Sequence, residues 1–564
     1  MRVTLVGLSS QYIHMTLAPW CLRHAVRKAG CPDELTLCQA HINEPVETLL
    51  RRILETRPEV VAFSVYIWNR TLTAALMRRI RAACPEIKLV CGGPEVTWSP
   101  AETMAEMPCD YLLRGAGEES FPRLLNALRG EADWGNIVGL CRRTQGGVVI
   151  SPEVAPAPPP DAGLYDEAYM SALQGRMAYV ETSRGCPFSC AFCLSGQRER
   201  VQFMPQEEAL ALLIRLGQSG SHIVKLIDRT FNCDRERTAF LLGGLMDAHA
   251  RGEIDQVCYH LEVGADLFDQ GLLELLAKAP AGLFQLEAGI QSFHAPTLES
   301  CNRRTDMARL THNLRTLLAG NNIHIHIDLI AGLPQEDLET FISSFNKAYA
   351  LRPHMLQLGF LKLLYGSRLR AQAEENGCRF SPDPPYEALA TREMSYEDMC
   401  QLQDVAQAVD RYYNSGKFQH TLAWALPRCG LTPYALYRRL GKALAQVGGS
   451  VSLTRAEELL GRELLALGLP REALRDHLVW DRLATDNTGY LPPPLQRAGD
   501  DLRMVFRSWK EAHPEARRPR LALVNEGRLL LSAQWTVLHP VTRLGDVQCW
   551  DAKTFAACCL PEGE

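Results

Sequence analysis

Short apolar runs alternate with segments of helical periodicity through the first 150 residues. Apolar runs at 3–9, 35–42, 60–68, 88–94 and 111–115 each precede a segment with helical spacing of apolar residues, near 17–29, 45–56, 70–83, 100–107 and 118–129. This alternation predicts βαβ units around a parallel sheet with helices on both faces. Ligands of such sheets bind beyond the carboxyl ends of the strands, so the loops there are the first candidate site.

A second alternation begins after a proline-rich stretch. Residues 151–163, SPEVAPAPPPDAG, contain five prolines and predict a stiff extended connector that cannot join a sheet. Strands are then expected at 177–183, 222–228, 257–263, 283–289, 323–330 and 355–364. Six strands separated by helical segments predict a partial (β/α)6 barrel, with its chemistry at the carboxyl ends of the strands.

The last third of the chain loses this regularity. The turn PDPPYEAL (382–389) interrupts the alternation, and a mostly helical region runs to about 480. Residues near 520–550 are β-rich, and RLALVNEG and RLLLSAQW are expected to pair as a hairpin through 525–527. We therefore predict an α/β protein: a Rossmann-like domain at 1–150, a linker at 151–175, a barrel at 176–370, and at 371–564 a mainly helical domain with a small β element.

Composition and charge limit the number of domains, the classes of partner and the cellular location that we expect. With 564 residues and 46% apolar content, the chain is long enough for three or four domains with real cores. A net charge of −5 offers no electrostatic case for nucleic acid or an anionic membrane surface. No signal-peptide pattern opens the sequence and no apolar run approaches 18 residues, so a cytoplasmic location is expected. Many of the 19 cysteines can then be reduced, buried small hydrophobes.

Three cysteines carry the strongest chemical signal. Cys186, Cys190 and Cys193 stand at C-x3-C-x2-C spacing within RGCPFSCAFC (184–193). Three thiolates on one short loop can bind three irons of a cubane cluster and leave the fourth iron open to an exogenous ligand. A structural zinc site needs four protein ligands, usually supplied by two pairs of cysteines, and no second cysteine pair lies nearby in the sequence. A disulfide is disfavoured in a chain without export features.

This motif resembles that of the radical S-adenosylmethionine superfamily, in which an aromatic residue often precedes the last cysteine, as Phe192 does here. The resemblance implies a 4Fe-4S cluster held by the three cysteines. It also implies S-adenosylmethionine chelated at the open iron through its amine and carboxylate, where one electron from the cluster can cleave it. The motif says little about the substrate.

Carboxylates recur along the predicted barrel strands: Asp228, Glu262, Glu287 and Asp328. An acidic group on a buried strand costs free energy unless it meets a cation or hydrogen-bond donors. A ribose diol and a methionine ammonium would supply both, whereas pairing with a neighbouring Arg or Lys is the structural alternative. LEAGIQS (286–292) and DLIAGLP (328–334) resemble the superfamily's later cofactor-contact motifs, which implies contacts from Glu287 and from the backbone around Gly332.

The strand IHIHID places His324, His326 and Asp328 on one face, because side chains alternate with period two. Two imidazoles and a carboxylate could bind a metal ion. We favour the alternative that this face lines the cofactor or substrate cavity without a second metal. Either imidazole could accept a proton from the substrate, but the sequence does not identify the donor.

Four of the loops after the first five strands are distinctive. SSQYIH (9–14), YIWN (66–69), GGPE (92–95) and GAGE (115–118) follow strands one, three, four and five. Glycines there allow the backbone to approach a large flat or phosphorylated ligand. No G-x-G-x-x-G fingerprint follows strand one, which argues against NAD or FAD.

Together these loops resemble the cobalamin-binding domain found upstream of many radical S-adenosylmethionine enzymes. The resemblance implies cobalamin contacts from these loops: Ser9, Gln11, Tyr12, His14, Tyr66, Trp68, Asn69, Gly92, Gly93, Glu95, Gly115 and Glu118. The usual Asp-x-His-x-x-Gly fingerprint, whose His ligates cobalt, is absent. We therefore expect His14 to line the pocket or pack within its loop rather than to ligate cobalt, and the lower cobalt ligand stays open.

The expected function is that of a cobalamin-dependent radical S-adenosylmethionine enzyme, most consistent with methylation of an unactivated carbon. The alternatives are a cobalamin-assisted radical cyclisation or rearrangement and, in another class, a cobalamin or iron-sulfur protein for sensing or electron transfer. The expected partners are a small-molecule or peptide substrate and a flavodoxin- or ferredoxin-type electron donor, without nucleic acid or membrane. The C-terminal region resembles an uncharacterised domain of one group of cobalamin-dependent enzymes, and could recognise substrate or cover the barrel mouth.

Overall fold

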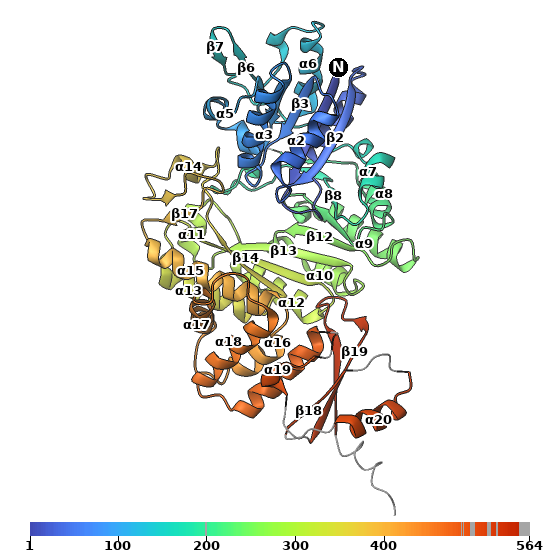
Figure 1. Ribbon diagram of the computed structural model, residues 1–564, viewed down its shortest axis with the longest axis vertical. Helices are drawn as coiled ribbons and strands as arrows, with labels where there is room; N and C mark the ends of the chain where they lie inside the picture. The colour runs from blue at the N-terminus through green and yellow to red at the C-terminus, as the bar shows by residue number, and fades with distance from the viewer. Residues whose placement is uncertain are drawn as a thin grey trace, which may run out of the picture.

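The computed structural model describes residues 1–197, 200–486, 488, 490–496, 502–515, 520–525 and 528–551. Three parts are stacked along its longest axis (Figure 1): the N-terminal sheet domain at one end, the barrel in the middle, and the helical and β-rich C-terminal region at the other end. The predicted α/β class is confirmed. Among the described residues, no helix combines the length and apolar character that crossing a bilayer requires.

The N-terminal domain is a seven-stranded sheet in the order β2-β1-β3-β4-β5-β6-β7. Its five predicted strands are all present and parallel: β1 (Arg2–Ser9), β2 (Glu34–His41), β3 (Val60–Ser64), β4 (Lys88–Gly92) and β5 (Tyr111–Leu113). An antiparallel hairpin, β6 (Leu140–Thr144) and β7 (Gly147–Val149), extends it beyond the prediction. Its helices are α1 (Ala18–Lys28), α2 (Val46–Glu55), α3 (Arg70–Ala83), α4 (Pro94–Thr97), α5 (Pro100–Glu106) and α6 (Gly117–Leu128).

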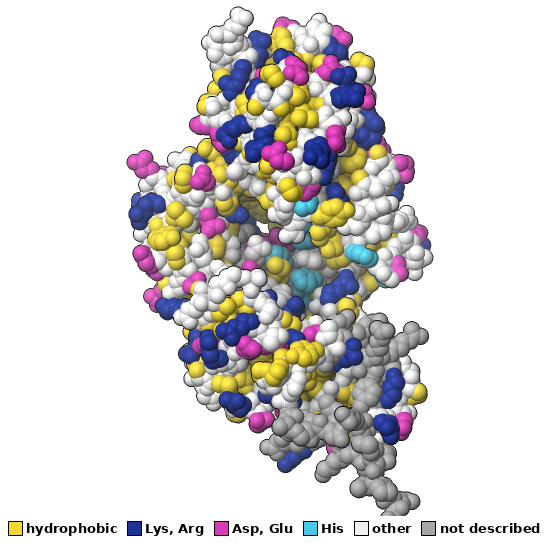
Figure 2. Space-filling view, in the orientation of Figure 1, with side chains coloured by type: hydrophobic (Ala, Val, Ile, Leu, Met, Phe, Trp, Pro, Cys, Tyr) yellow, Lys and Arg dark blue, Asp and Glu magenta, His cyan; other side chains and the backbone are white. Residues whose placement is uncertain are grey.

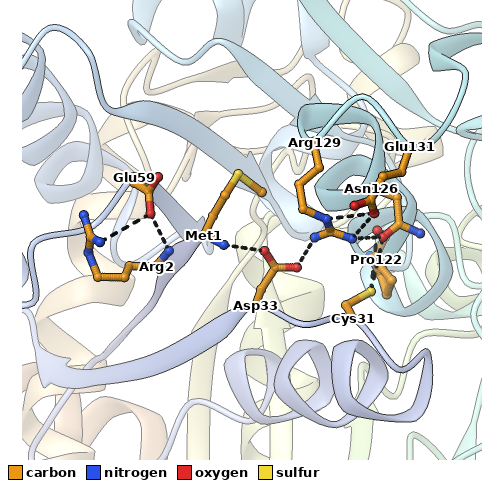
Figure 3. Close-up of polar contacts among 9 residues, drawn as sticks. All are labelled: Met1, Arg2, Cys31, Asp33, Glu59, Pro122, Asn126, Arg129 and Glu131. Carbon is orange, nitrogen blue, oxygen red and sulfur yellow. Dashed lines mark hydrogen bonds and ion pairs between the residues drawn. The ribbon is translucent and has the colours of Figure 1, made fainter.

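Polar groups tie down the amino-terminal edge of this sheet (Figure 3). The buried carboxylate of Asp33 lies 3.1 Å from the Met1 amino group and also pairs with Arg129, while Arg2 pairs with Glu59. The carboxyl ends of the strands point the other way, toward the barrel (Figure 1). This orientation presents the loops after the strands to the middle of the molecule.

The proline-rich linker makes one contact that the sequence analysis excluded. Ala155 forms a single parallel bridge with Gly115, with Ala155 N donating to Arg114 O at 2.9 Å. The expectation that this stretch cannot join a sheet was thus wrong at one residue, because Ala155, unlike the prolines around it, keeps its N–H. Further on, a 3-10 turn, η2 (Ala162–Leu164), and α7 (Glu167–Ala172) pack against the barrel through Leu164 and Tyr169.

The barrel is a six-stranded sheet with every neighbouring pair parallel, as predicted. In sheet order its strands are β8 (Ala178–Val180), β11 (Ile223–Leu226), β12 (Cys258–Val263), β13 (Phe284–Gln291), β14 (His324–Ala331) and β15 (Met355–Phe360). Its helices are α8 (Gln206–Gly217), α9 (Arg235–Ala250), α10 (Gln270–Ala277), α11 (Ala295–Ser300), α12 (Met307–Gly320) and α13 (Leu338–Ala350). A two-residue ladder, β9 (Ser183–Arg184) with β10 (Gln202–Phe203), flanks the loop after β8.

Alternation divides the barrel strands into two faces. On β13, Phe284, Leu286 and Ala288 are buried in the main apolar cluster, whereas Gln285 and Glu287 between them are half-buried. The apolar face packs on the helices, so the polar face lines the inside of the barrel, called the lumen below.

The C-terminal region is mainly helical with a terminal sheet, as predicted. It comprises α14 (Arg368–Ala371), β16 (Arg379–Phe380), β17 (Ala388–Ala390), α15 (Tyr396–Ala408), a π-helical turn η6 (Val409–Asn414), α16 (Gln419–Ala425), α17 (Pro433–Ala445), α18 (Leu453–Ala466), α19 (Arg471–Thr485), α20 (Leu502–Ala512), β18 (Arg520–Val524), β19 (Leu529–Leu538) and β20 (Gly545–Asp551). The predicted hairpin is confirmed as β18 paired with β19. Of its expected turn, residues 526 and 527 lie outside the described residues.

Candidate functional site

The cysteine loop follows directly from β8 and the short β9. Cys190 is buried, and Cys186 and Cys193 are half-buried. Among the described residues, each sulfur has one hydrogen-bonding neighbour: Thr230 Oγ1 lies 3.3 Å from Cys186 Sγ, Ser195 N donates to Cys193 Sγ at 3.4 Å, and Arg303 Nη1 donates to Cys190 Sγ at 3.6 Å. Hydrogen bonds to sulfur tune the potential of iron-sulfur clusters. Donors therefore reach the sulfurs of Cys190 and Cys193, whereas the Thr230 hydroxyl donates to Arg229 O at 2.7 Å. Three reduced thiols on this loop fit a cubane cluster.

Backbone hydrogen bonds fix this loop to two distant segments. Ala191 N donates to Cys301 O at 2.8 Å, and Leu369 N donates to Ala191 O at 2.9 Å. A hollow of about 500 Å³ lies beside the loop, lined by Ser189, Cys190, Ala191, Cys193, Gly196, Gly366, Ser367, Arg368, Arg370 and Ala371. The loop is therefore held rigidly between α11 and the segment after the last barrel strand.

Glu287 is the focus of the lumen. Its Oε2 lies 2.8 Å from His260 Nε2, 3.5 Å from Lys225 Nζ and 4.0 Å from His326 Nδ1. Burial raises the pKa of this carboxyl, but the hydrogen bond from His260 and the charges of Lys225 and His326 outweigh burial and lower the pKa to about 2. Glu287 is therefore an anion with three nitrogen partners across the lumen.

The predicted face of β14 is confirmed by the placement of its side chains. His326 Nε2 lies 3.0 Å from Asp328 Oδ1, outside hydrogen-bonding geometry, and both atoms are buried. Burial lowers the pKa of His326, but Asp328 and Glu287 reverse the effect and raise it, whereas burial and the neighbouring imidazoles lower the pKa of His324 to about 4. Glu287, His326 and Asp328 offer ligand atoms within 4.8 Å of one another. Metal binding and cavity lining therefore both stay predictions for this strand.

The other predicted cofactor residues of the barrel differ in their availability. Glu262 faces the lumen with Arg229 at 3.9 Å, and burial raises its pKa. Asp228 is fully engaged, accepting hydrogen bonds from Thr182 N at 2.7 Å and from two hydroxyls. Gly332 has a left-handed φ of +84°, and an added Cβ would lie 3.1 Å from Met399 Cε. Phe192 packs against the main apolar cluster. The structure thus gives Asp228, Gly332 and Phe192 structural roles, and their cofactor contacts stay predictions.

Exposed apolar side chains gather on the loops beyond the N-terminal sheet. Tyr12, Ile13, Trp68 and Trp98 are 56%, 42%, 45% and 37% exposed, and all lie after β1, β3 or β4. Trp68 stacks on Tyr66 with ring centroids 4.5 Å apart. Large exposed apolar side chains in one place mark a binding surface. Tyr12 and Trp68 are among the residues for which cobalamin contacts were predicted, and those contacts stay predictions.

His14 lies at the junction of the two domains. Its Nδ1 is 2.7 Å from the hydroxyl of Tyr179 on β8, and Ile13 O accepts a hydrogen bond from Met177 N. Burial lowers the pKa of His14, and the charge of Lys225 lowers it further. The contact with Tyr179 agrees with a packing role for His14, while cobalt ligation is untested.

Several residues of the predicted cobalamin loops are engaged by the protein itself. Ser9 Oγ donates to Ala40 O at 3.0 Å, and the buried Asn69 amide donates to Leu8 O at 3.0 Å. The buried Glu95 carboxylate pairs with Arg70 at 3.4 Å and accepts the hydroxyl of Tyr386. Gln11 is exposed, and a Cβ added at Gly92 would lie no nearer than 3.4 Å to its neighbours, an ordinary contact.

The structure explains the two left-handed glycines of these loops by chain packing, whereas close approach of a ligand was expected. Gly93 has φ +113°, and an added Cβ would lie 2.5 Å from Val65 O; Gly115 has φ +86°, and an added Cβ would lie 2.2 Å from Ala155 O. Protein backbone therefore occupies the space that a side chain would need. The glycines permit chain packing, and close ligand approach is not required to explain them.

Arg184 connects the two candidate sites. Its Nη1 lies 2.6 Å from Glu118 of the GAGE loop, and its Nη2 lies 2.7 Å from Glu181. Burial disfavours the charged guanidinium, but the two carboxylates outweigh burial and raise the pKa of Arg184. The residue just before the cysteine motif thus fixes the cysteine loop to a predicted cobalamin loop.

Sequence reasoning missed five residues of these sites. Lys225 and His260 could have been found, because the period-two argument that was applied to His324, His326 and Asp328 also places them on the inner faces of their strands. Gln291 lies within LEAGIQS and alternates in step with Glu287, so it could have been found in the same way, whereas Trp98 and Arg303 had no comparable signal. Gln291 has a left-handed φ of +71°, and its buried Oε1 has no hydrogen-bond partner among the residues that the structure describes. Arg303 donates to Cys190, which is 113 residues away in the sequence.

Figure 2 shows a recess between the N-terminal domain and the barrel in which histidine side chains gather. The cysteine loop, the lumen and the apolar loop surface therefore define the class: a radical enzyme barrel joined to a corrinoid-binding sheet. Family comparison agrees: residues 3–125 match the B12 binding domain, residues 180–348 the radical SAM superfamily, and residues 374–500 a protein family of unknown function, DUF4080. The chain thus carries a B12-binding domain, a radical SAM domain and a C-terminal DUF4080 domain.

Individual relatives are distant. The cobalamin-dependent radical SAM methyltransferase TokK of Streptomyces tokunonensis is 27% identical over 318 residues, 53% of this chain and 45% of TokK. The anaerobic magnesium-protoporphyrin IX monomethyl ester cyclase of Cereibacter sphaeroides is 25% identical over 355 residues, 59% of this chain and 56% of the cyclase. The chain thus spans about half the length of these relatives.

A solved structure shares the fold over more of the chain. The cobalamin-dependent S-adenosylmethionine radical enzyme OxsB, with aqua-cobalamin bound, superposes with a TM-score of 0.60 at 14% identity. The match covers 87% of this chain and 81% of OxsB. At this identity the likeness shows a common fold, including part of the C-terminal region.

Proposed function

We propose that the protein is a cobalamin-dependent radical S-adenosylmethionine enzyme that methylates an unactivated carbon of its substrate. The observation that carries the proposal is the shared border of the two sites: Arg184 joins the cysteine loop to the GAGE loop, and His14 of the first cobalamin loop contacts Tyr179 of the barrel. Two cofactors held at these places would face one lumen.

The chain's own residues would hold and orient these groups. Cys186, Cys190 and Cys193 would ligate the cluster, and Glu262, Glu287 and Asp328 would bind the ribose and methionyl groups of S-adenosylmethionine. Tyr12, Tyr66 and Trp68 would pack against the corrin. When bound, the cluster with S-adenosylmethionine supplies a carbon-centred radical, and cobalamin supplies a transferable methyl group. A carbon radical needs no activated leaving group, which is why a separate methyl carrier is useful.

A second candidate is a cobalamin-assisted radical cyclisation or rearrangement. The match to the protoporphyrin ester cyclase favours it, because that relative aligns over slightly more of the chain than TokK does. A sensing or electron-transfer protein is the third candidate. The many ionisable side chains of the lumen favour an enzyme, since an electron carrier has no need of such a lining.

The partners follow from the same proposal. A flavodoxin- or ferredoxin-type protein would deliver electrons to the cluster, and the substrate would be a small molecule or a peptide, in a cytoplasmic setting. The C-terminal domain would cover the barrel, because Gly332 at the end of β14 packs against Met399 of α15.

The test uses anaerobically purified protein supplied with cobalamin, iron and sulfide. S-adenosylmethionine labelled in its methyl group should yield 5'-deoxyadenosine and labelled methylcobalamin, and products should gain one methyl group. Substituting the three cysteines by Ala should remove the cluster and the cleavage. Deoxyadenosine formation without methylation of cobalamin would reject the methyltransferase proposal in favour of the cyclase. Absence of cleavage from a fully loaded cluster would favour the electron-transfer class.

A further inference from the structure

The turn at the end of α11 holds the cysteine loop through consecutive residues. Cys301 O accepts a hydrogen bond from Ala191 N at 2.8 Å. Asn302 Nδ2 donates to Ser189 O at 3.2 Å and to Ser189 Oγ at 2.6 Å. We call residues 301–303 the clamp. Its first two residues contact the cysteine loop on both sides of the middle cysteine, so they fix the path of the loop there.

The third residue of the clamp contacts that cysteine itself, which is a predicted cluster ligand. Arg303 Nη1 donates to Cys190 Sγ at 3.6 Å, and Nη2 of the same guanidinium donates to Gly289 O on β13, a strand that lines the lumen. A guanidinium is planar and always charged, so two separate acceptors fix its position and its orientation. Arg303 is therefore held between the cysteine loop and the lumen.

In the described part of the chain, no other charged side chain forms a hydrogen bond to a sulfur of the three cysteines. The donor to Cys193 Sγ is the backbone Ser195 N, which is neutral. Near Cys186 Sγ, the Thr230 hydroxyl donates to Arg229 O. Charge-assisted hydrogen bonds are about twice as strong as neutral ones. The guanidinium of the clamp therefore makes the strongest of these contacts, and it makes it to one sulfur.

One N–H of this guanidinium has no acceptor in the described structure. Arg303 Nε is buried and forms no hydrogen bond with the described residues. A buried donor without an acceptor costs free energy and needs an explanation. The sulfides of an iron-sulfur cluster are hydrogen-bond acceptors, so a cluster ligated by Cys190 would supply the kind of partner that this N–H lacks.

The charge of the guanidinium has a direct consequence for such a cluster. Three thiolates give the oxidised cluster a net negative charge, and reduction adds one more. A cation beside one thiolate stabilises the reduced form more than the oxidised form, because the Coulomb attraction grows with the charge. Net charge and hydrogen bonds to sulfur are two of the features that set the potential of iron-sulfur clusters.

We propose that Arg303 is a positioning residue that acts through Cys190 and raises the reduction potential of the predicted 4Fe-4S cluster. Because it requires this cluster, the role of Arg303 rests on the proposed function, and it deepens that function: the chain itself assists the reduction that a flavodoxin- or ferredoxin-type partner performs. The partner gives one electron to the cluster, and Arg303 forms and breaks no covalent bond. The other two residues of the clamp hold the loop, and Arg303 adds the charge.

The test measures the potential of the reconstituted holoenzyme without turnover. Wild type, Arg303→Gln, Arg303→Lys and Arg304→Gln are prepared anaerobically with iron, sulfide and cobalamin, and the iron and sulfide of each are quantified. The cluster is titrated with redox dyes in the absence of S-adenosylmethionine and followed by electron paramagnetic resonance. Arg303→Gln removes the charge but keeps an amide donor, and Arg303→Lys keeps the charge. Arg304→Gln is the control, because it removes an exposed charge at the next position.

At a fixed potential, Arg303→Gln should lower the ratio of reduced to oxidised cluster at least tenfold. For a one-electron couple this change is a shift of about 59 mV to lower potential. Arg303→Lys should lie between Arg303→Gln and wild type, and Arg304→Gln should match wild type. A role of Arg303 in structure alone would instead lower the iron content of Arg303→Gln and leave the potential of its remaining clusters unchanged.

Four results would overturn the role of Arg303. They are an unchanged potential in Arg303→Gln, complete loss of the cluster from Arg303→Gln, an equal shift in Arg304→Gln, and a shift in Arg303→Lys as large as that in Arg303→Gln. With a cubane cluster present in wild type, each of them leaves the proposed function intact. If wild type itself assembles no cubane cluster, the proposed function fails, and the role of Arg303 fails with it.

Discussion

Replacing Arg184 by Met should uncouple the cysteine loop from the cobalamin loop. The guanidinium lies 2.6 Å from Glu118 and 2.7 Å from Glu181, and only 12% of its side chain is exposed. Removing it leaves two partly buried carboxylates facing each other without a cation. Breaking a buried ion pair from one side costs about 3 kcal/mol or more. Since 1.4 kcal/mol is a factor of about ten, local opening of this region should become roughly 100-fold more frequent.

Native-state hydrogen exchange measures this opening at the amides of Ser183 and Arg184, which pair with β10. Arg184→Lys keeps the charge but not the forked donor geometry, and should fall between wild type and Arg184→Met. The control is Arg235→Met, which removes an ion pair with Asp269 from a side chain that is 72% exposed; exposed pairs contribute about 0–1 kcal/mol. Unchanged exchange in Arg184→Met, or an equal effect of the control, would refute the bridging role.

Three further predictions concern single positions. Burial raises the pKa of Glu336 to about 7, so the contribution of this carboxyl to stability is greatest below its ordinary pKa and is lost as the pH rises through about 7. Glu336→Gln should flatten this pH dependence and stabilise the protein at pH 8 by up to about 3 kcal/mol. Denaturant unfolding at pH 4.5 and pH 8 measures both effects. Gly93→Ala should destabilise the N-terminal domain by more than Gly30→Ala, because both are left-handed but only Gly93 has backbone against the added Cβ; equal melting temperatures would contradict this. Tyr386→Phe removes the hydroxyl that donates to Glu95. This variant should bind cobalamin severalfold more weakly in a spectroscopic titration, while its iron content stays unchanged. Loss of iron to the same extent as loss of cobalamin binding would indicate general unfolding.

The sequence predicted the strands of both sheets because their apolar positions have a clear period. The hairpin β6–β7 was missed for the same physical reason: every residue of β7 is exposed, so no buried face leaves a pattern to read. Glu287 was singled out because carboxylates recur along the barrel strands and because LEAGIQS resembles a cofactor-contact motif. The contacts of Glu95 with Tyr386 and of Glu118 with Arg184 could not be predicted, since these partners come from other domains and no local rule pairs them.

Asn414 indicates what the C-terminal domain contributes to the barrel. A partial barrel leaves the edge of β15 with unpaired N–H and C=O groups, and buried groups of this kind need partners. The Asn414 side chain at the end of η6 supplies both: Leu356 N donates to Asn414 Oδ1 and Asn414 Nδ2 donates to Leu356 O, each at 2.9 Å. One amide thus imitates the neighbouring strand that the barrel lacks.

Asn414→Leu should therefore leave a buried donor and a buried acceptor unpaired on β15, since Leu356 is fully buried. The expected cost is about 1–3 kcal/mol for each unsatisfied group. Asn414→Asp restores only the acceptor and should be intermediate, and Asn43→Leu, at an exposed asparagine of the N-terminal domain, is the control. Hydrogen exchange at the Leu356 amide reports the change directly. If this amide exchanges equally slowly in Asn414→Leu and in wild type, the edge of β15 is protected by packing alone, and the C-terminal domain does not complete the sheet.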